Sequence, residues 1–397
     1  MKVIMRKIVT VTAMILICSV LLSGCWDRRE INDIAFVLGT AVDKEGSEYR
    51  TSVQVALPGE LGGASGKGTN GGKGWYIESK LGKTVRLSTS AVQKSNSREL
   101  NVSTRRSLII GEELAREGIS SMLDVFTRIP QNRLLSVVAV TEGPAYKILD
   151  TDAPIEPYPS EMVRELILSY TKKPIRIVTL LDELLSEGID VTLPIVKVDT
   201  SVPPKIGEAV TNIRIDGLAI FKGDRMVGTL KGDDAKMIIL GMNQNENLEI
   251  TIPSPTGEGT LEISLRHSKV KLVPMIQGDD VTMRVNIQLV GTVIESASDF
   301  SPTSNMGMRQ LEESTQKKVQ SDLTKALAVL QDQYQSDSLG FGQTIQHKKP
   351  KDWDRLKSRW PDIYPHVKVE IAVDMHLETV GQALEPMGLP EEEIIHD

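Results

Sequence analysis

The chain has 397 residues, of which 40% are hydrophobic and 25% are charged, as is typical of globular proteins, and this length favours two or three domains. Its formal net charge is −7, and an acidic chain is a poor candidate for binding nucleic acid, so we exclude that partner. Only 4% of the residues are aromatic, so we expect cores of Val, Ile and Leu, which suit sheets with packed helices.

The first 24 residues have the pattern of an export signal. Lys2, Arg6 and Lys7 form a basic start, and the fifteen residues 8–22 carry no charge. This run is short for a membrane-spanning helix, which needs about 20 residues. We therefore predict a cleaved signal peptide over residues 1–24. An uncleaved N-terminal anchor is the alternative interpretation.

Cys25 lies where the apolar run ends and the polar chain begins. The residues before it, Leu22, Ser23 and Gly24, resemble with Cys25 the lipobox of bacterial lipoproteins. This resemblance implies cleavage before Cys25 and a covalent diacylglycerol on its thiol. Two acyl chains hold a protein at a membrane where one is marginal. A buried or free thiol is the alternative, and the position of Cys25 argues against it.

The mature chain would carry Cys25 as its one cysteine, because Cys18 leaves with the signal. No intramolecular disulfide is then available. Residues 1–24 hold three basic and no acidic residues, so the mature formal charge is −10, from 43 basic and 53 acidic residues. The surface of an acidic protein does not favour an anionic membrane, so the lipid is expected to hold the protein there.

Residues 25–150 are predicted to form an N-terminal α+β domain. Runs of β-branched and apolar residues indicate strands, and apolar residues at helical spacing after Glu112 indicate a helix. The expected elements in chain order are two strands within 33–57 around Gly46, a Gly-rich flexible loop at 57–74, a strand from Trp75, a helix at 84–99, a strand at 108–110, a helix from Glu112 and a strand at 134–140.

A small middle domain is predicted over residues 151–205, between two Pro-rich segments at 150–160 and 200–207. Proline cannot continue a helix or pair fully in a sheet, so such segments favour linkers. The expected elements are helices at 160–171 and 178–187 and a strand at 190–199.

Residues 206–385 are predicted to form a C-terminal α+β domain, followed by an acidic tail at 386–397. Gly223-Asp224 stands between two alternating apolar runs, which indicates a hairpin. Apolar residues at 3.6-residue spacing predict one long helix over 306–335. Its apolar stripe contains Leu311, Val319, Leu323, Ala326, Leu327, Leu330 and Tyr334, and the other expected elements are strands at 247–253, 259–273, 279–294 and 366–381.

The predicted fold class is therefore α+β, with three domains after a cleaved lipoprotein signal peptide. Each domain is expected to be a mainly antiparallel β-sheet with packed helices.

The sequence shows no pattern of catalytic or metal-binding residues. The Gly-rich loop lacks the spacing of a phosphate-binding loop, because Leu61 stands at the first required glycine and Gly68 follows Lys67. The five histidines are dispersed and form no HExxH or paired-ligand spacing. We therefore predict a protein that is not an enzyme, with no catalytic residue, no metal and no cofactor apart from the lipid on Cys25.

The residues after Cys25 carry a specific resemblance. The segment Trp26-Asp27-Arg28-Arg29-Glu30, followed by AFVLGTAVDKEG, resembles the start of the C subunit of spore germinant receptors, the Ger(x)C family of lipoproteins. Three later segments resemble that family in the same order: a strand–turn–strand at 217–230, the D-x-x-G-F-G turn at 337–342 and the closing Trp-containing segment at 352–381. Together these segments span nearly the whole mature chain.

The resemblance implies a three-domain α+β lipoprotein on the outer face of the cell or spore inner membrane. It implies assembly with two integral membrane subunits, A and B, into a nutrient receptor. Germinant recognition in that family is ascribed mainly to the B subunit, so binding of a small-molecule germinant by this chain is not expected.

We therefore expect a non-enzymatic, lipid-anchored receptor subunit that is needed for receptor assembly or signalling in germination. A solute-binding lipoprotein of a transporter is one alternative, but it needs two similar lobes around a cleft, and the three unequal units argue against it. A membrane-tethered hydrolase is another alternative, and it lacks a recognisable nucleophile or metal set.

Overall fold

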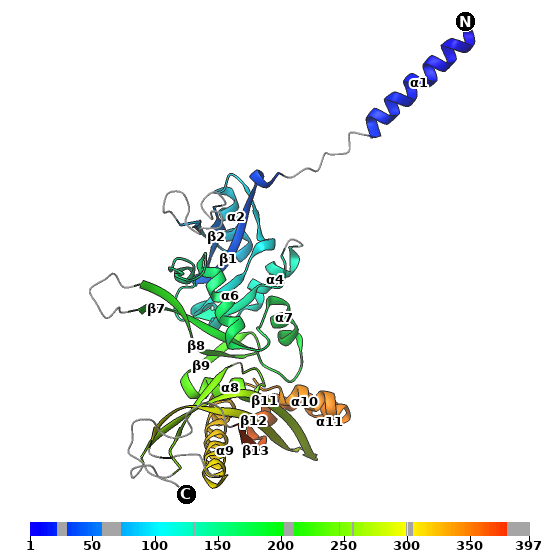
Figure 1. Cartoon of the computed structure of the whole chain (residues 1–397). Coiled ribbons are helices and arrows are strands. Elements are labelled where there is room, and N and C mark those ends of the chain that lie inside the picture. Colours follow the sequence, from blue (N-terminus) through cyan, green and yellow to red (C-terminus); the bar gives the residue numbers. More distant parts are fainter. Residues whose placement is uncertain are drawn as a thin grey trace.

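The structure is a computed structural model of the whole chain, and it describes residues 1–21, 30–57, 73–129, 132–201, 210–245, 247–255, 258–298, 300 and 305–378. The predicted cleavage site, most of the Gly-rich loop and the acidic tail lie outside these residues. Figure 1 shows helix α1 (Lys2–Leu21) apart from a body in which two sheets lie one above the other. No helix in the described part of the chain is long and apolar enough to cross a membrane.

The first sheet contains nine strands of the described chain, in the order β3-β2-β1-β5-β6-β7-β8-β9, with β4 paired to β1. Its centre is parallel, from β1 through β5 and β6 to β7, and its flanks are antiparallel. The strands are β1 (Ile34–Glu45), β2 (Glu48–Ala56), β3 (Trp75–Gly82), β4 (Glu99–Asn101), β5 (Ser107–Gly111), β6 (Val137–Thr141), β7 (Thr192–Ser201), β8 (Val210–Lys222) and β9 (Arg225–Leu230).

Helices cover both faces of this sheet, so its central strands are buried along their length. Leu108 and Ile110 of β5 join the core under α3, α4 and α7, whereas Ile109 joins the core under α5 and α6. The surrounding helical segments are the short 3₁₀ turns η1 (Ile31–Asp33) and η2 (Val102–Thr104), and α2 (Val85–Lys94), α3 (Glu112–Glu117), α4 (Ser120–Arg128), α5 (Tyr146–Leu149), α6 (Pro159–Tyr170) and α7 (Ile177–Leu185).

The second sheet has the order β10-β11-β12-β13 in the described residues, and only the β12–β13 pair among these is parallel. One face carries α8 and α9, while alternate residues of the strands on the other face are exposed. The elements are α8 (Gly232–Gly241), β10 (Leu248–Pro253), β11 (Gly259–Gln277), β12 (Asp280–Ser298), α9 (Asn305–Ala328), the π-helical η3 (Val329–Tyr334), α10 (Phe341–Lys348), α11 (Pro350–Leu356), η4 (Lys357–Arg359), α12 (Trp360–Ile363), η5 (Tyr364–His366) and β13 (Lys368–Leu377).

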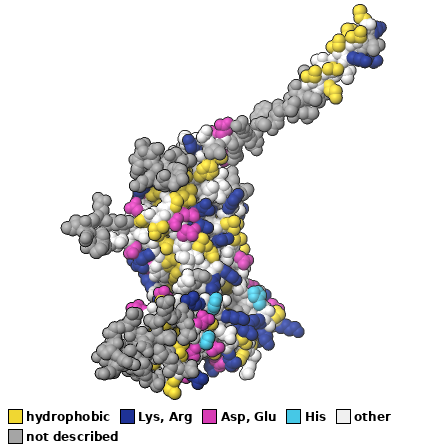
Figure 2. Space-filling view, viewed as in Figure 1, with side chains coloured by type: hydrophobic (Ala, Val, Ile, Leu, Met, Phe, Trp, Pro, Cys, Tyr) yellow, Lys and Arg dark blue, Asp and Glu magenta, His cyan; other side chains and the backbone are white. Residues whose placement is uncertain are grey.

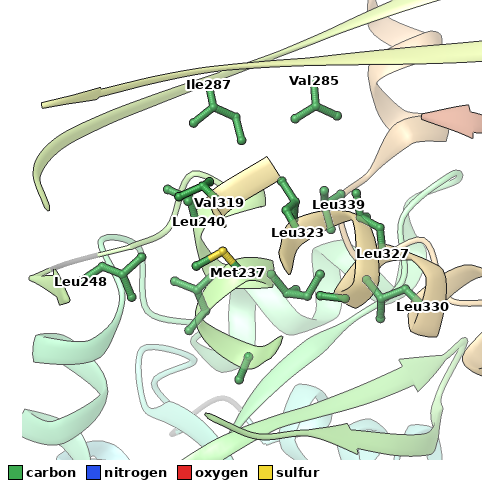
Figure 3. Packing of buried hydrophobic residues seen from close by; sticks show 14 of the residues in the cluster. Met237, Leu240, Leu248, Val285, Ile287, Val319, Leu323, Leu327, Leu330 and Leu339 are labelled. Carbon is green, nitrogen blue, oxygen red and sulfur yellow. The ribbon is translucent and has the colours of Figure 1, made fainter. Parts of the chain in front are cut away.

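The long helix predicted from the apolar stripe is confirmed as α9 with its π-helical continuation η3. Leu323 is fully buried, and Figure 3 shows it with Val319 on the helix side of the core, while Val285 and Ile287 of β12 point toward them. Four further residues of the predicted stripe are also buried: Leu311, Ala326, Leu327 and Leu330. Tyr334, the last residue of the stripe, is half-buried.

Strand β8 of the first sheet packs against the cores of both halves of the body. Leu218 and Ile220 pack into the core of the second sheet, whereas Ala219 and Phe221 pack into a core of the first. Because successive side chains of a strand point to opposite faces, four consecutive apolar residues serve two cores. The side chains of β8, a strand of the first sheet, therefore join the two halves by packing as well as by loops.

Two parts of the predicted architecture differ from the structure. The first sheet is parallel at its centre, where a mainly antiparallel sheet was predicted. The strand–helix–strand order over residues 107–141 explains the parallel pairing of β5 with β6. The connecting helices carry the chain back to the same end of the sheet, so that the second strand runs in the same direction as the first. The three-domain count is not confirmed, because β7 of the predicted middle domain pairs with β6 and with β8 in one continuous sheet.

Leu323→Ala tests the packing of the long helix. We expect the substitution to lower the free energy of unfolding by about 2–5 kcal/mol, because a fully buried leucine leaves a cavity. Urea unfolding followed by circular dichroism measures the change. Thr324→Ala is the control, since Thr324 is exposed and its loss is expected to change the free energy by at most about 0.5 kcal/mol. Equal effects of the two substitutions would contradict the packing.

Candidate functional site

Asp337 follows the long helix and is buried between the two sheets, with only 1% of its surface exposed. Three N–H groups donate to its carboxylate: the Phe341 amide at 2.7 Å, the Gly342 amide at 2.9 Å and the Trp360 indole at 3.0 Å. The two amides belong to the first turn of α10. The side chain therefore caps one helix and fixes a tryptophan from a later one.

The backbone of Asp337 pairs with Asp190, which lies between α7 and β7. The Asp337 amide donates to Asp190 Oδ2 at 2.8 Å, and the Asp190 amide donates to the Asp337 carbonyl at 3.1 Å. Lys222 Nζ lies 3.0 Å from Asp190 Oδ2, and the Gly223 amide donates to Asp190 Oδ1 at 3.0 Å. Asp190 thus holds the β8–β9 turn of the first sheet and the segment that follows α9.

The two halves also come into close contact at Gly188 and Gly342. The Gln343 amide donates to the Gly188 carbonyl at 2.7 Å. A Cβ atom on Gly342 would lie 2.6 Å from Gly188 Cα and 2.7 Å from the Trp360 indole nitrogen, so only glycine fits there. We name the set the Asp337 junction: Glu187, Gly188, Asp190, Lys222, Gly223, Asp337, Phe341, Gly342, Gln343, Trp353 and Trp360.

Aromatic side chains pack around the junction, although they make up only 4% of the chain. Trp353 and Trp360 form an edge-on pair with ring centroids 5.5 Å apart, and Tyr364 lies 6.2 Å from Trp360. The Trp353 indole donates to Glu187 Oε2 at 3.1 Å. These rings keep water away from Asp337 and add a further bond to the first half of the chain.

Burial raises the pKa of the Asp337 carboxyl to about 7, and the nearby charge of Asp190 acts in the same direction. The three N–H donors favour the ionised form and limit the rise in the pKa. Burial likewise raises the pKa of Glu183 on α7 to about 7 and that of Asp43 on β1 to about 6. The folded chain therefore retains protons near neutral pH that the unfolded chain releases.

The Asp337 junction has the features of a structural contact rather than of a catalytic site. The donors around Asp337 are backbone amides and an indole, which neither accept protons nor act as nucleophiles at neutral pH. Among the described residues, no group of three or more His, Cys, Asp or Glu could hold a metal ion. The arrangement fixes the orientation of the two sheets.

Basic side chains gather near the junction, on the part of the surface where Figure 1 places α10 and α11 (Figure 2). Two of these basic residues form ion pairs within the chain. Arg355 and Arg359 both bind Asp279 at the β11–β12 turn, at 2.8 and 3.0 Å. These contacts fasten α11 and the segment after it to the second sheet.

Only one of the sequence-predicted site residues, Glu30, is among the described residues. Leu22, Ser23, Gly24, Cys25, Trp26, Asp27, Arg28 and Arg29 all lie outside the described residues. Glu30 is described and exposed, directly before η1. Asp337 begins the segment 337–342 and Lys222 lies in the segment 217–230, both of which carried part of the resemblance, whereas Asp190 lay outside those segments.

Comparison with known proteins identifies the family. Residues 27–198 match the sequence model described as the spore germination protein N-terminal domain, and residues 216–381 match the model described as spore germination B3/GerAC like, C-terminal. The putative spore germination protein YfkR of Bacillus subtilis (strain 168) is 33% identical over 379 residues, covering 95% of this chain and 98% of that protein. The chain belongs to the Ger(x)C family of spore germination proteins.

More distant relatives extend over the same length. Spore germination protein KC of Bacillus subtilis (strain 168) is 23% identical over 94% of this chain and 96% of its own. The crystal structure of the GerBC protein has a TM-score of 0.55 and 18% identity, and the match covers 86% of this chain and 97% of that chain. At this identity the structural likeness shows a shared α+β fold.

The Asp337 junction lies where the two family regions meet. Asp190 belongs to the region matched by the N-terminal model, and Lys222 and Asp337 belong to the region matched by the C-terminal model. The junction thus connects the two parts that are recognised separately by sequence.

Asp337→Asn is expected to lower the free energy of unfolding at pH 5 by about 1–3 kcal/mol. The amide of asparagine offers one acceptor oxygen where the carboxyl group binds three donors, so a buried donor loses its partner. Tryptophan fluorescence during urea unfolding reports on the site directly, because Trp353 and Trp360 line it. Asp354→Asn, at an exposed position of α11, is the control and is expected to have little effect.

The stability of the wild-type chain is expected to fall as the pH rises from about 4 to about 7. The raised pKa values of Asp337, Glu183 and Asp43 mean that the folded state binds more protons than the unfolded state in this range. Asp337→Asn removes one of these groups, so its unfolding free energy should vary less with pH. A cost of the substitution that is the same at pH 5 and pH 8 would contradict the raised pKa of Asp337.

Proposed function

We propose that this chain is the non-enzymatic, lipid-anchored C subunit of a nutrient germinant receptor. It resides on the outer face of the spore inner membrane and takes part in receptor assembly or signalling with two integral membrane subunits, A and B. The observation that carries the proposal is similarity over nearly the whole chain to spore germination proteins, together with the lipobox-like residues that end at Cys25.

The position of Cys25 relative to the first sheet supports a short tether. Ile34, where β1 begins, is only nine positions after Cys25 in the sequence. A fully extended chain spans at most about 3.6 Å per residue, so a lipid on Cys25 keeps β1 within about 30 Å of the membrane. Because β1 pairs with β2, β4 and β5, the tether pulls directly on the interior of the first sheet.

The junction supports a role in coupling. Side chains of β8 in the tethered first sheet pack into the core of the second sheet, and the two halves are bonded through Asp190 and Asp337. A partner that moves one sheet therefore displaces the other as well. A solute-binding lipoprotein of a transporter is not favoured, because the relatives described above are named for spore germination.

Cys25→Ala tests the anchor. We expect the variant to incorporate no labelled fatty acid and to keep its signal peptide, because the thiol carries the lipid and cleavage depends on it. Radiolabelling and mass spectrometry of the protein measure both effects. Cys18→Ala is a matched control, since it removes the chain's other cysteine, which lies within the predicted signal peptide. It should leave processing unchanged. Lipid incorporation by Cys25→Ala would contradict the anchor.

Deletion of the gene in a spore-forming host tests the receptor role. Spores without the protein are expected to lose their response to at least one nutrient, because a receptor lacking a subunit does not assemble or signal. The fall in optical density on nutrient addition measures this response. An intact gene copy should restore it, and the Cys25→Ala copy should restore it poorly. Normal responses of the deletion strain to every nutrient would overturn the proposal.

A further inference from the structure

A cavity of about 420 Å³ lies over the first sheet, between α2 and α4. This volume is in the range of small-molecule sites. Val85 and Phe126 on one side belong to the main core of the sheet, whereas Val37 and Val53 on the other belong to a smaller separate cluster. The cavity is thus a gap between two apolar clusters that do not meet.

Arg105 lines this cavity and is buried, with 6% of its surface exposed. Its Nε donates to Ser136 Oγ at 3.1 Å, and its guanidinium lies 4.6 Å from the centre of the Phe126 ring. The Ser136 hydroxyl donates in turn to the Arg105 carbonyl at 3.0 Å. These contacts fix the side chain between the sheet and α4.

The charge of Arg105 has no acidic partner in the described part of the chain. Its Nη2 group finds no hydrogen-bond acceptor there, and the Thr40 hydroxyl, which lines the same cavity, is also without a partner. Burial lowers the pKa of Arg105 to about 9, so the guanidinium remains charged at neutral pH. A buried charge that lacks a counterion is unfavourable, and an anion in the cavity would relieve this cost.

The remaining lining favours a small anion with an apolar body. Arg86 and Lys94 of α2 also line the cavity, so three cations stand against one carboxylate, Glu99, in a chain whose net charge is −7. Apolar side chains contribute much of the lining, among them Val37, Val53 and Phe126. A carboxylate supplies the negative charge that the buried guanidinium lacks, and its apolar body suits the apolar lining.

We propose that the cavity between α2 and α4 is a binding site for a small carboxylate with an apolar body, attracted by the uncompensated charge of Arg105. The site is separate from the Asp337 junction and does not depend on the proposed receptor role. It also goes beyond the sequence-based expectation for this chain, because the sequence had indicated no small-molecule site.

Hexanoate is a suitable probe, since it joins one carboxylate to a short apolar chain. We expect the full chain in detergent to bind hexanoate in isothermal titration calorimetry and to melt at a higher temperature in its presence. Hexanamide has the same shape without the charge and should bind at least about tenfold more weakly, because charged hydrogen bonds are the stronger ones. Inorganic phosphate lacks the apolar body and should also bind weakly.

Arg105→Met tests the named residue. Methionine keeps an apolar stem of similar length, and replacing an unpaired buried charge with an apolar group does not disfavour folding. The variant is expected to fold and to bind hexanoate at least about tenfold more weakly. Arg128→Met is the control, because Arg128 is an exposed arginine of α4 that does not line the cavity, and it should bind hexanoate as the wild type does.

Ser90→Phe gives a second test that leaves the charge in place. Ser90 lines the cavity from α2 and is partly exposed, so a phenyl ring there fills the space without disturbing the core. This variant should fold and lose hexanoate binding. The proposal is overturned if the wild type does not bind hexanoate, if hexanamide or phosphate binds equally well, or if Arg105→Met or Ser90→Phe binds hexanoate like the wild type.

Discussion

The reciprocal pairing of Asp190 and Asp337 is the constraint on which the arrangement of the two sheets depends. Each backbone amide donates to the other residue, and the Asp337 carboxylate receives three further donors. Because all of these hydrogen bonds are made, the buried Asp337 carboxyl fixes the position of one half relative to the other. Any shift between the halves would leave a buried polar group unpaired. Lys222 balances the charge of Asp190 at 3.0 Å.

Strand β8 also holds the two sheets together. Its alternate residues fill a core of each half, so the two sheets cannot separate without exposing apolar surface on both sides. Within the proposed role, the lipid at Cys25 positions the first sheet near the membrane, and the junction fixes where the second sheet points. A receptor subunit without catalytic groups can act in this manner, by presenting two surfaces at a fixed relative orientation.

Local patterns in the sequence predict elements better than they predict pairing. The apolar stripe of α9 and the hairpin at Gly223 were predicted correctly, because periodicity and turn chemistry are local signals. Helix α8 was missed, since its short apolar run after Gly232 has no distinctive period. The junction needed tertiary information, because Asp190 and Asp337 are 147 residues apart. Arg105 likewise gave no signal before its burial was known.

A distance measurement between the two sheets tests the central claim most directly. Spin labels at Arg128→Cys on α4 and Asp374→Cys on β13, both exposed positions, can be placed in a chain with Cys18 and Cys25 replaced by alanine. Pulsed electron paramagnetic resonance should give one narrow distance distribution for this chain and a broader one when Asp337→Asn is added. A broad distribution in the chain that retains Asp337, or identical distributions in both, would contradict the claim that the junction fixes the two sheets.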